Sequence, residues 1–487
     1  MPSQYLAFDQ LRLRFLKGQP ILVSILAPAG FGKSELLSAW LHFTASHGSK
    51  YAVCAVTGVA ATQLGGCTIH NLLSLRADGS TDIENHPERK RYLEEVQGII
   101  IDEAMMAEYA LGNNFTEVLR QIPLRENKRR PGALPKFGYR DILLGGDLRQ
   151  LPPASGSMPY WAADVFYEDF EIFVLSEDRR HERDIETQSI KELVAWGGLD
   201  DAESKDPDTT WTVDPRVQKF ILEGYVRGWG LTGADVDVDV GTALFAKRAD
   251  VRRWNNACVK QIEQQHQETC EAVDVHGYDP RAAHGTDTLT ARSMRMSGLQ
   301  TPQKLTLRTC PEHRMRLMLL SNQNVQHGWA NGSHVRLLPE ASWTGEPQKL
   351  KKRKDGTFLA EEIELEQLAG ADFNVHVIED SLISFSKTIH YGKTECTSIG
   401  LMTETSSQTR TELRQVPLTL AYGLTIHKCQ GITIPVSYPS LNDIFGFGMP
   451  YTLLTRTPFS DNMLFIGVPP KDILEKLLQR DSQGEIA

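Results

Sequence analysis

The sequence predicts an α/β fold with two lobes and a small antiparallel insert in the second lobe. Residues 20–175 alternate short apolar runs with helical stretches, a pattern typical of a parallel sheet covered by helices on both faces. A second series begins with the apolar run at 242–246, followed by apolar residues at helical spacing over 251–262. Between roughly 333 and 410 the pattern changes to short alternating strands such as 373–378, which favours an antiparallel insert.

Length, charge and cysteine usage exclude several protein classes. The 487 residues are 41% hydrophobic, which is enough for more than one core, and the net charge of −10 excludes a histone-like basic surface. The 7 cysteines are odd in number and never form Cys-x-x-Cys, which argues against a disulfide framework and a zinc ribbon. No run of about 20 apolar residues is present, so we expect an intracellular chain with no membrane partner.

The expected elements follow in chain order. Five apolar runs are expected to form the first sheet, at 20–27, 51–56, 98–101, 141–145 and 171–175. Residues 33–45 are predicted to form a helix, and the stretch 197–216, rich in Asp, Gly and Pro, a linker. The predicted boundaries are a first lobe at 1–175 with a short polar insert at 77–90, and a second lobe at 176–332 and 411–487 interrupted by the insert at 333–410.

The first strand leads into a loop of phosphate-binding character. Residues 27–34, Ala-Pro-Ala-Gly-Phe-Gly-Lys-Ser, join the strand to the helix, so backbone N–H groups and the helix N-terminus would face an anion. Lys33 would neutralise the β- and γ-phosphates of a nucleotide, and Ser34 would bind Mg²⁺. Gly30 and Gly32 supply permissive backbone positions, whereas Ala27, which stands where the consensus has its first glycine, requires a negative φ.

The strand at 98–101 ends in two carboxylates, Asp102 and Glu103. Ligands bind α/β proteins at the carboxyl ends of the strands. Asp102 is therefore predicted to hold Mg²⁺, and Glu103 to orient and deprotonate the attacking water. A further strand and loop, 141–153, carries Gln150, a neutral donor and acceptor suited to a γ-phosphate or its water.

These segments, in this order, resemble the PIF-type (petite integration frequency) family of superfamily 1 DNA helicases, relatives of the RecD helicases. The most specific likeness is the run 55–70, similar to the family's Thr-Gly-x-Ala-Ala … Gly-x-Thr-x-His motif. The resemblance continues at 175–181, 242–256, 317–332, 417–433 and 451–456. It implies two RecA-like P-loop motor domains with parallel sheets, and a small antiparallel β-barrel-like insert in the second.

The resemblance also implies a function. Family members are ATP-dependent motors that move 5′ to 3′ on single-stranded DNA and unwind duplexes. The cofactors expected from the resemblance are ATP and Mg²⁺, and the expected partners are single-stranded DNA and forked or tailed duplex DNA. The expected roles are DNA repair, recombination or telomere maintenance, in the nucleus or mitochondrion of a eukaryote, by a monomer or a DNA-induced oligomer.

Matching positions carry the family's residue roles to this chain. The nucleotide would be bound by Gln4 at the adenine, and at the phosphates and Mg²⁺ by Gly30, Gly32, Lys33, Ser34, Asp102, Gln430 and Gly431. Catalysis would use Glu103, Gln150, Arg180 and Arg456, the two arginines acting as fingers from the second lobe. The DNA strand would contact Thr57, His70, Thr425, His427 and Lys428. The chain departs from the family at Ala27, at 135–138 and at Arg179, where an aromatic is usual, so Arg179 and Arg180 both qualify as the first finger.

Two alternative functions stay open. The helicase portion of a Helitron-type transposon protein resembles the same family, and a nuclease domain with paired tyrosines and a His-x-His motif, ahead of Gln4 in a longer chain, would distinguish it. A nucleotide-dependent DNA-binding protein without turnover is a different class, and the presence of Lys33, Glu103 and the arginine pair argues against it. Two basic tracks, 125–140 and 349–354, are either DNA contacts or solvated loops.

Overall fold

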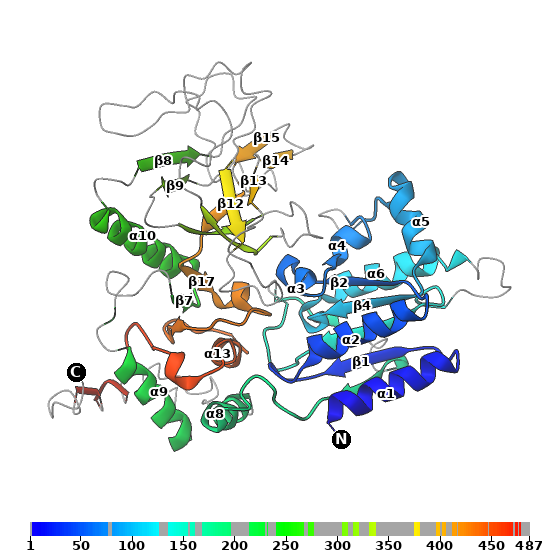
Figure 1. Cartoon of the computed structure of the whole chain (residues 1–487), viewed down its shortest axis with the longest axis horizontal. Coiled ribbons are helices and arrows are strands. Elements are labelled where there is room, and N and C mark those ends of the chain that lie inside the picture. Colours follow the sequence, from blue (N-terminus) through cyan, green and yellow to red (C-terminus); the bar gives the residue numbers. More distant parts are fainter. Residues whose placement is uncertain are drawn as a thin grey trace, which may run out of the picture.

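The computed structural model shows two lobes lying side by side (Figure 1). The first lobe is described almost throughout and the second with larger gaps. The described residues are 2–75, 80–125, 135–153, 156–160, 168–195, 214–228, 231, 240–266, 271–276, 304–309, 315–320, 331–337, 375–379, 396–399, 402–405, 412–415, 417–446, 448–470, 473–475 and 477–478.

The first lobe is built on a six-stranded parallel sheet with the strand order β3-β2-β4-β5-β1-β6. Its strands are β1 (Leu22–Leu26), β2 (Tyr51–Ala55), β3 (Cys67–Thr68), β4 (Gly98–Asp102), β5 (Asp141–Gly146) and β6 (Glu171–Val174). All five predicted strands are confirmed, and the two-residue β3 is the addition. Because the strands are parallel, the loops that follow β1, β4 and β5 meet at one edge of the sheet.

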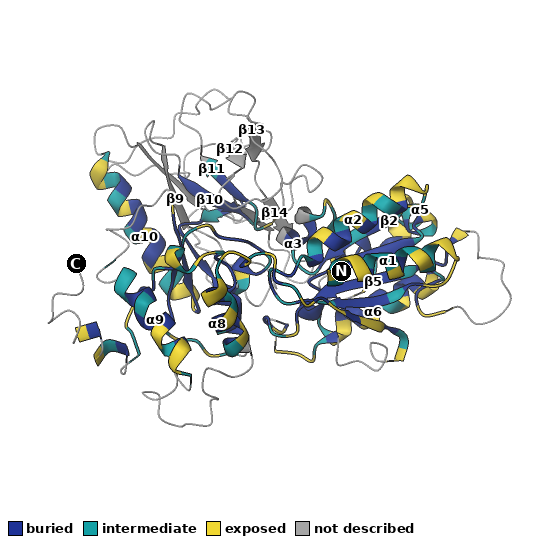
Figure 2. Cartoon of the chain, turned by 60° about the horizontal axis from the view of Figure 1, so that its bottom comes forward, coloured by how far each residue is buried: buried dark blue, intermediate teal, exposed yellow. Residues whose placement is uncertain are grey.

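Both faces of this sheet are covered. Alternate strand residues point to opposite sides, so Val23 and Ile100 pack with Trp40 in one cluster, while Ile99 packs with Phe115 in another. Figure 2 shows the buried strands between helices whose outer faces are exposed. The helical elements of this lobe are α1 (Ser3–Leu16), α2 (Lys33–Ser46), α3 (Gly58–Gln63), α4 (Ile69–Leu72), η1 (Ile83–Asn85), α5 (Pro87–Glu95), η2 (Ala104–Met106) and α6 (Tyr109–Gln121). The helix α2 confirms the one predicted at 33–45.

The second lobe contains a smaller parallel sheet with the order β17-β7-β18. The predicted strand at 242–246 is β7, and the helical pattern over 251–262 lies within α10, where Trp254 and Cys258 are buried. The elements of this part are α8 (Ile185–Ala195), α9 (Pro215–Arg227), β7 (Thr242–Phe245), α10 (Arg248–Gln265), β17 (Gly423–Thr425), η8 (Ile426–Cys429), β18 (Ser437–Pro439), α13 (Met449–Leu454) and η9 (Ser460–Asn462).

Antiparallel strands lie above this second sheet in the view of Figure 1. They form one sheet of order β13-β12-β11-β10-β16 and two hairpins, β8-β9 and β14-β15. Their bounds are β8 (Glu271–His276), β9 (Lys304–Thr309), β10 (Arg316–Leu319), β11 (His334–Leu337), β12 (Val375–Glu379), β13 (Cys396–Ile399), β14 (Met402–Thr405), β15 (Glu412–Gln415) and β16 (Leu418–Leu420). The predicted α/β fold with parallel sheets and a small antiparallel part is confirmed. Antiparallel strands also lie on both sides of 333–410, and the domain boundaries stay predictions.

Several predicted segments lie partly or wholly outside the described residues. The track at 349–354 is outside, as are 126–134 and most of the linker 197–216; α9 begins at the end of that linker, at Pro215. Of the polar insert 77–90, residues 80–90 are described and contain η1 and the start of α5.

Candidate nucleotide and DNA site

The loop between β1 and α2 has the backbone that the sequence predicts. Gly30 and Gly32 have φ values of 90° and 76°, whereas Ala27 keeps a negative φ and is buried. The left-handed Gly32 precedes Lys33, the first residue of α2, and no side chain among the described residues caps that helix end. Its N–H groups and the positive end of the helix dipole therefore suit a phosphate.

Lys33 lies between the two acids that follow β4. Its Nζ is 3.3 Å from Oδ1 of Asp102 and 3.7 Å from Oε1 of Glu103. Burial of Lys33 disfavours its charge, but the nearby carboxylates of Asp102, Glu103 and Asp147 prevail and raise the pKa of Lys33 above its ordinary value. The lysine therefore stays charged beside the two carboxylates.

Ser34 and Asp102 bring together oxygen ligands for a metal ion. The Ser34 hydroxyl lies 3.4 Å from Oδ2 of Asp102 and can donate to it. A hydroxyl and a carboxylate, completed by phosphate oxygens and water, fit the octahedral oxygen shell of Mg²⁺. Within the described part of the chain no three His, Cys, Asp or Glu side chains gather as a metal site.

Glu103 is buried in a strained backbone conformation. Its φ of 51° is left-handed, although glutamate carries a Cβ, and its N–H donates to Oδ1 of Asp102 at 2.9 Å. Such strain is commonly found at functional sites. Burial raises the pKa of Glu103, an effect opposed mainly by the charge of Lys33 and increased by Asp102. A carboxylate with a raised pKa is a better general base.

Asp147, which the sequence analysis did not single out, organises the next part of the site. Its Oδ2 accepts hydrogen bonds from the backbone N–H of Ala29 at 2.9 Å, from Nε2 of Gln150 at 3.1 Å and from the hydroxyl of Tyr451 at 3.0 Å. Gln150 is thereby held with its Oε1 buried and unpartnered among the described residues. The signal for Asp147 was its position directly after the buried strand β5.

Tyr451 brings the second lobe to this cluster. It lies in α13, and its hydroxyl is 3.1 Å from the N–H of Ala29, close enough to accept a hydrogen bond while donating to Asp147. Arg149 stacks over its ring at 5.3 Å from the centroid. The loop at 27–34 is therefore in direct contact with the second lobe.

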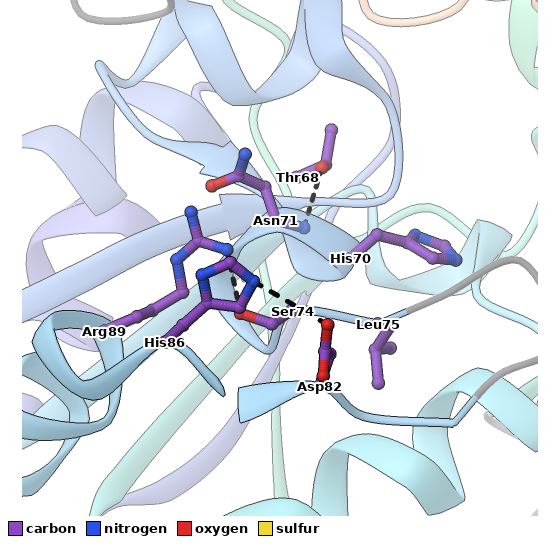
Figure 3. Close-up of a pocket in the computed structure, with 8 residues that line it drawn as sticks. All are labelled: Thr68, His70, Asn71, Ser74, Leu75, Asp82, His86 and Arg89. Atoms are coloured by element: carbon purple, nitrogen blue, oxygen red, sulfur yellow. Dashed lines mark hydrogen bonds and ion pairs between the residues drawn. The ribbon is translucent and has the colours of Figure 1, made fainter. Parts of the chain in front are cut away.

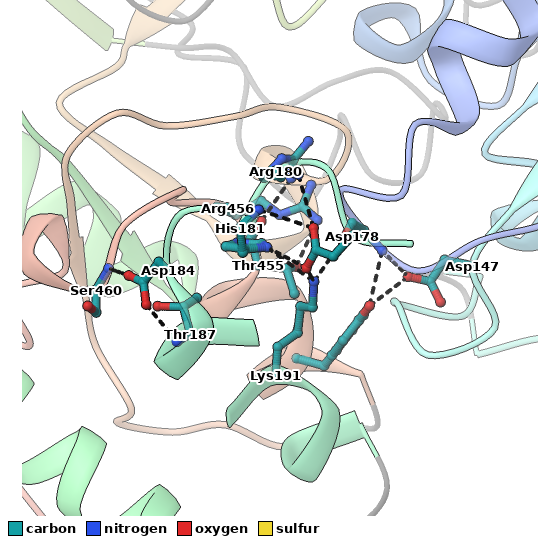
Figure 4. A network of polar contacts seen from close by, with 12 residues as sticks. Asp147, Asp178, Arg180, His181, Asp184, Thr187, Lys191, Thr455, Arg456 and Ser460 are labelled. Carbon is teal, nitrogen blue, oxygen red and sulfur yellow. Dashed lines mark hydrogen bonds and ion pairs between the residues drawn. The ribbon is translucent and has the colours of Figure 1, made fainter. Parts of the chain in front are cut away.

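Arg180 and Arg456 lie at this contact between the lobes (Figure 4). The N–H of Arg180 donates to the carbonyl of Gly30 at 3.1 Å, and its Nη1 donates to the carbonyl of Thr455 at 2.9 Å. Burial, and then the positive charge of Arg456, lower the pKa of Arg180 to about 10. The neighbouring Arg179 points outward instead, 3.4 Å from Glu182, which favours Arg180 as the finger.

Arg456 is almost fully buried, with 1% of its surface exposed. Its guanidinium donates to the carbonyls of Thr452 and Ile432 and to the Thr455 hydroxyl, so its orientation is fixed by the second lobe. Its charge still acts on Glu103, where it lowers the pKa and so favours the ionised carboxylate.

The remaining predicted nucleotide residues border the same loop. Nε2 of Gln4 donates to the carbonyl of Phe31 at 2.9 Å, which places this glutamine over the loop. Gln430 is buried with an Oε1 that has no partner among the described residues, and Gly431 follows with a φ of 80°.

Two of the predicted DNA residues, Thr57 and Thr425, lie at the carboxyl ends of parallel strands, one in each lobe. Thr57 follows β2 and accepts a hydrogen bond from the N–H of Ala60 at the start of α3, while Thr425 ends β17 directly before η8. His427 and Lys428 lie in η8, where Lys428 is exposed, and partial burial, with the charge of Arg248, lowers the pKa of His427.

His70 is exposed on α4 and borders a pocket of about 390 Å³ (Figure 3). The other lining residues are Thr68, Asn71, Ser74, Leu75, Asp82, His86 and Arg89. Arg89 donates from Nη1 to the Ser74 hydroxyl at 2.8 Å, so the pocket has a cationic wall. This pocket joins α4 to the polar insert predicted at 77–90.

Part of the first basic track is structural. Arg140 is buried and donates to the carbonyls of Leu119, Phe137 and Leu93, while Lys136 pairs with Asp169 at 2.7 Å. Both of these side chains are therefore held within the first lobe.

Comparisons with known proteins identify the relatives of this chain. A family model described as PIF1-like helicase matches residues 2–195. The ATP-dependent DNA helicase Pif1 of Bdellovibrio bacteriovorus is 26% identical over 485 residues, covering 97% of this chain and 89% of the relative. The chain therefore resembles PIF1-like helicases, through the family model over residues 2–195 and through relatives that align with nearly its whole length. The ATP-dependent DNA helicase Pif1 of a Psychrobacter species is 25% identical, covering 92% of this chain, which spans 66% of that relative.

Solved structures of Pif1 helicases share the fold of this chain. The Pif1 helicase of Candida albicans has a TM-score of 0.66 at 19% identity, covering 98% of this chain and 99% of the other. A Bacteroides Pif1 in complex with ADP-AlF3 and single-stranded DNA has a TM-score of 0.61 at 17% identity, covering 98% and 97%. The predicted family, fold and enzyme class, ATP-dependent DNA helicase, are confirmed. The individual site residues stay predictions.

Proposed function

We propose that this chain couples ATP hydrolysis to movement along single-stranded DNA from 5′ to 3′, and so unwinds tailed or forked duplexes. The observation that supports a motor is the contact between the lobes, where the loop at 27–34 meets Arg180 and Tyr451. A nucleotide bound at that loop would hold the lobes together, and its hydrolysis would release them, which is the cycle of a stepping motor.

Each part of phosphoryl transfer has a candidate residue. Lys33 would exchange its carboxylate partners for the β- and γ-phosphates, and Ser34 and Asp102 would hold Mg²⁺, which would stabilise the negative charge of the phosphate oxygens when bound. Glu103 would take the proton of the attacking water, while Gln150 would place that water through its unpartnered Oε1.

Arg180 and Arg456 would bring positive charge next to the phosphate that is transferred. An arginine finger stays charged near neutral pH and can bind two oxygens at once. Because the Arg180 main chain is bonded to Gly30 and its guanidinium to the second lobe, a change in the contact between lobes would move this charge relative to the phosphate.

We propose that the DNA strand passes the ends of β2 and β17. Thr57 lies there in the first lobe and Thr425 in the second, so movement of the lobes would change the distance between two strand contacts. The pocket beside His70, with Arg89 in its wall, suits a DNA phosphate at the entry to this path.

Two rival functions predict different behaviour. A nucleotide-dependent DNA-binding protein without turnover would bind both ligands and hydrolyse nothing. A Helitron-type protein would carry a nuclease domain ahead of Gln4 in a longer chain. The arrangement of the buried Lys33 and Glu103 with the partly buried Arg180 favours turnover over the first rival.

The resemblance to PIF1-like helicases supports roles in DNA repair, recombination or telomere maintenance, inside the cell, by a monomer or a DNA-induced oligomer. Every helix in the described part of the chain is too short or too polar to cross a lipid bilayer.

The direct test is strand displacement on matched duplexes that carry either a 5′ or a 3′ single-stranded tail. We expect displacement with ATP from the 5′-tailed duplex alone. The variant Lys33→Ala should lose both hydrolysis and displacement by at least about 100-fold, because the phosphate loses its cation. The surface variant Lys50→Ala, whose lysine is 49% exposed, is the matched control. Equal displacement of both duplexes would refute the direction, and hydrolysis-free DNA binding would favour the rival without turnover.

A further inference from the structure

A buried charged cluster lies next to the nucleotide loop, outside the groups that the chemistry uses (Figure 4). Asp178, His181 and Lys191 have 6%, 0% and 2% of their surfaces exposed. The Lys191 ammonium and the Asp178 carboxylate form an ion pair. A buried ion pair stabilises a fold little more than apolar residues of the same size would. Stability alone therefore does not explain why these charged residues are buried here.

Asp178 accepts hydrogen bonds on both carboxylate oxygens. Oδ1 accepts from the backbone N–H of Arg180 at 3.0 Å and of His181 at 3.1 Å. Oδ2 accepts from Lys191 and lies 3.0 Å from Nδ1 of His181. Burial alone would raise the pKa of Asp178, but the hydrogen bond from His181 and the charge of Lys191 hold it well below its usual value. The carboxylate therefore stays ionised and fixes the main chain at Arg180.

Lys191 connects the same carboxylate to the nucleotide loop. Its Nζ donates to the carbonyl of Ala29 at 3.2 Å and lies 4.9 Å from the centre of the Phe31 ring. The N–H of Ala29 donates to Asp147, so both backbone polar groups of this residue are held by side chains from elsewhere.

Gly30 shows how closely the cluster approaches the loop. A Cβ at this position would lie 2.6 Å from Cβ of Arg180 and 2.9 Å from Oδ1 of Asp178. The carbonyl of Gly30 accepts hydrogen bonds from the N–H groups of both Arg179 and Arg180. The loop and the arginine segment therefore form one packed unit.

Lys191 lies in α8, which belongs to the core of the second lobe. Its neighbour Ile190 is buried in the cluster that also contains Leu453 of α13 and Ala29 of the loop. A movement of the second lobe would thus reach Ala29 through the Lys191 side chain.

We propose that Asp178, His181 and Lys191 are positioning residues that hold Arg180 against the nucleotide loop and couple that loop to the second lobe. This inference rests on the proposed function. None of the three side chains touches the reacting atoms. The cluster positions Arg180 and the backbone of Ala29. Substitution of the cluster residues should therefore slow hydrolysis more than it weakens nucleotide binding.

The test compares Asp178→Asn, Lys191→Gln and the double variant with the wild type. All of these proteins are made as the whole chain. Steady-state ATP hydrolysis is measured with saturating single-stranded DNA, and the dissociation constant for a fluorescent ADP is measured separately. We expect each single change to lower kcat by about 10- to 100-fold while the dissociation constant changes less than about 3-fold. Because the partners act as a unit, the double variant should lose no more than the worse single one.

Asp141→Asn is the matched control. Asp141 is partly buried and accepts hydrogen bonds from the N–H of Ile21 at 2.9 Å and from the Tyr51 hydroxyl at 2.6 Å, but it begins β5 at the opposite end of the strand from the site. We expect this variant to melt at a lower temperature and to keep its kcat. A cluster that serves stability alone would behave in the same way.

The outcomes separate the two proposals. If the wild type shows no DNA-stimulated hydrolysis, the motor function fails and the positioning role fails with it. If the wild type is active and Asp178→Asn and Lys191→Gln keep its kcat, the positioning role alone is overturned. Should Asp178→Asn not fold, as judged by its melting curve and loss of ADP binding, Lys191→Gln decides the result.

Discussion

At the scale of single residues, the site is a set of opposed charges held in the interior. Lys33 lies between the carboxylates of Asp102 and Glu103 and balances part of their charge. The positive charges of Arg180 and Arg456 also act on Glu103. Such a site is organised before the nucleotide arrives, which lowers the cost of reorganisation during the reaction.

Glu103→Gln should keep nucleotide binding and lose hydrolysis. The amide cannot take a proton from water, so we expect kcat to fall by about 10²- to 10⁴-fold. Hydrolysis and binding of a fluorescent ATP analogue are the measurements, with the exposed Glu95→Gln as control. A Glu103→Gln protein with normal turnover would remove this residue from its role.

The rate should also depend on pH through Glu103. Burial raises the pKa of this carboxyl in the folded protein, and the working base is the ionised form. Activity should therefore be complete above the raised pKa and be lost as the pH falls through it, at a higher pH than an ordinary glutamate allows. A profile of kcat against pH that stays flat down to the ordinary range would contradict this.

Sequence patterns predicted the site residues that belong to a local motif. They did not predict the residues that are brought together by contacts between distant segments. Lys33 and Glu103 follow apolar strands within a few residues, so their positions could be predicted. Asp178, His181 and Lys191 come together only because α8 folds back onto the loop, and no spacing in the chain signals that contact.

At the scale of elements, the strand, loop and helix at 22–46 form the central unit. Continuous apolar strands and helical spacing predicted its elements to within about two residues, since each pattern is local. The short β3 and the turns η1 and η2 have too few residues to leave a periodic pattern.

Gly30→Ala tests the packing of this unit. The left-handed φ and the contacts with Arg180 and Asp178 predict a loss of about 2–4 kcal/mol in the free energy of unfolding, together with a loss of hydrolysis. Gly48→Ala is the control, because its φ is +74° with nothing within 4 Å, and should cost about 1 kcal/mol and leave hydrolysis unchanged. Urea unfolding and ATP turnover check both; equal effects of the two changes would rule out the packed unit.

At the scale of the whole molecule, two lobes share one site although the chain is acidic overall. The net charge of −10 leaves DNA binding to local groups rather than to a general positive field. The relation between the lobes could be predicted from the family resemblance, whereas the contacts that join them depend on residues hundreds of positions apart, such as Tyr451 and Asp147.

Gly448→Ala should disturb this contact. Gly448 precedes α13 with a φ of +75°, and a Cβ there would lie 2.5 Å from the carbonyl oxygen of Gln150 in the first lobe. We expect kcat to fall by about 10-fold, because the lobes would meet less closely around the nucleotide. Gly156→Ala, with a φ of +71° and nothing within 4 Å, serves as the control. Wild-type turnover in Gly448→Ala would show that closure does not depend on this approach.

The most direct measurement of the central claim is the rate of ATP hydrolysis by the wild-type chain, with and without single-stranded DNA. If the nucleotide loop and the DNA contacts are joined through the two lobes, DNA should raise the rate strongly, and added salt should reduce that stimulation. A rate that is the same with and without DNA would contradict a motor in which the two lobes link hydrolysis to the strand.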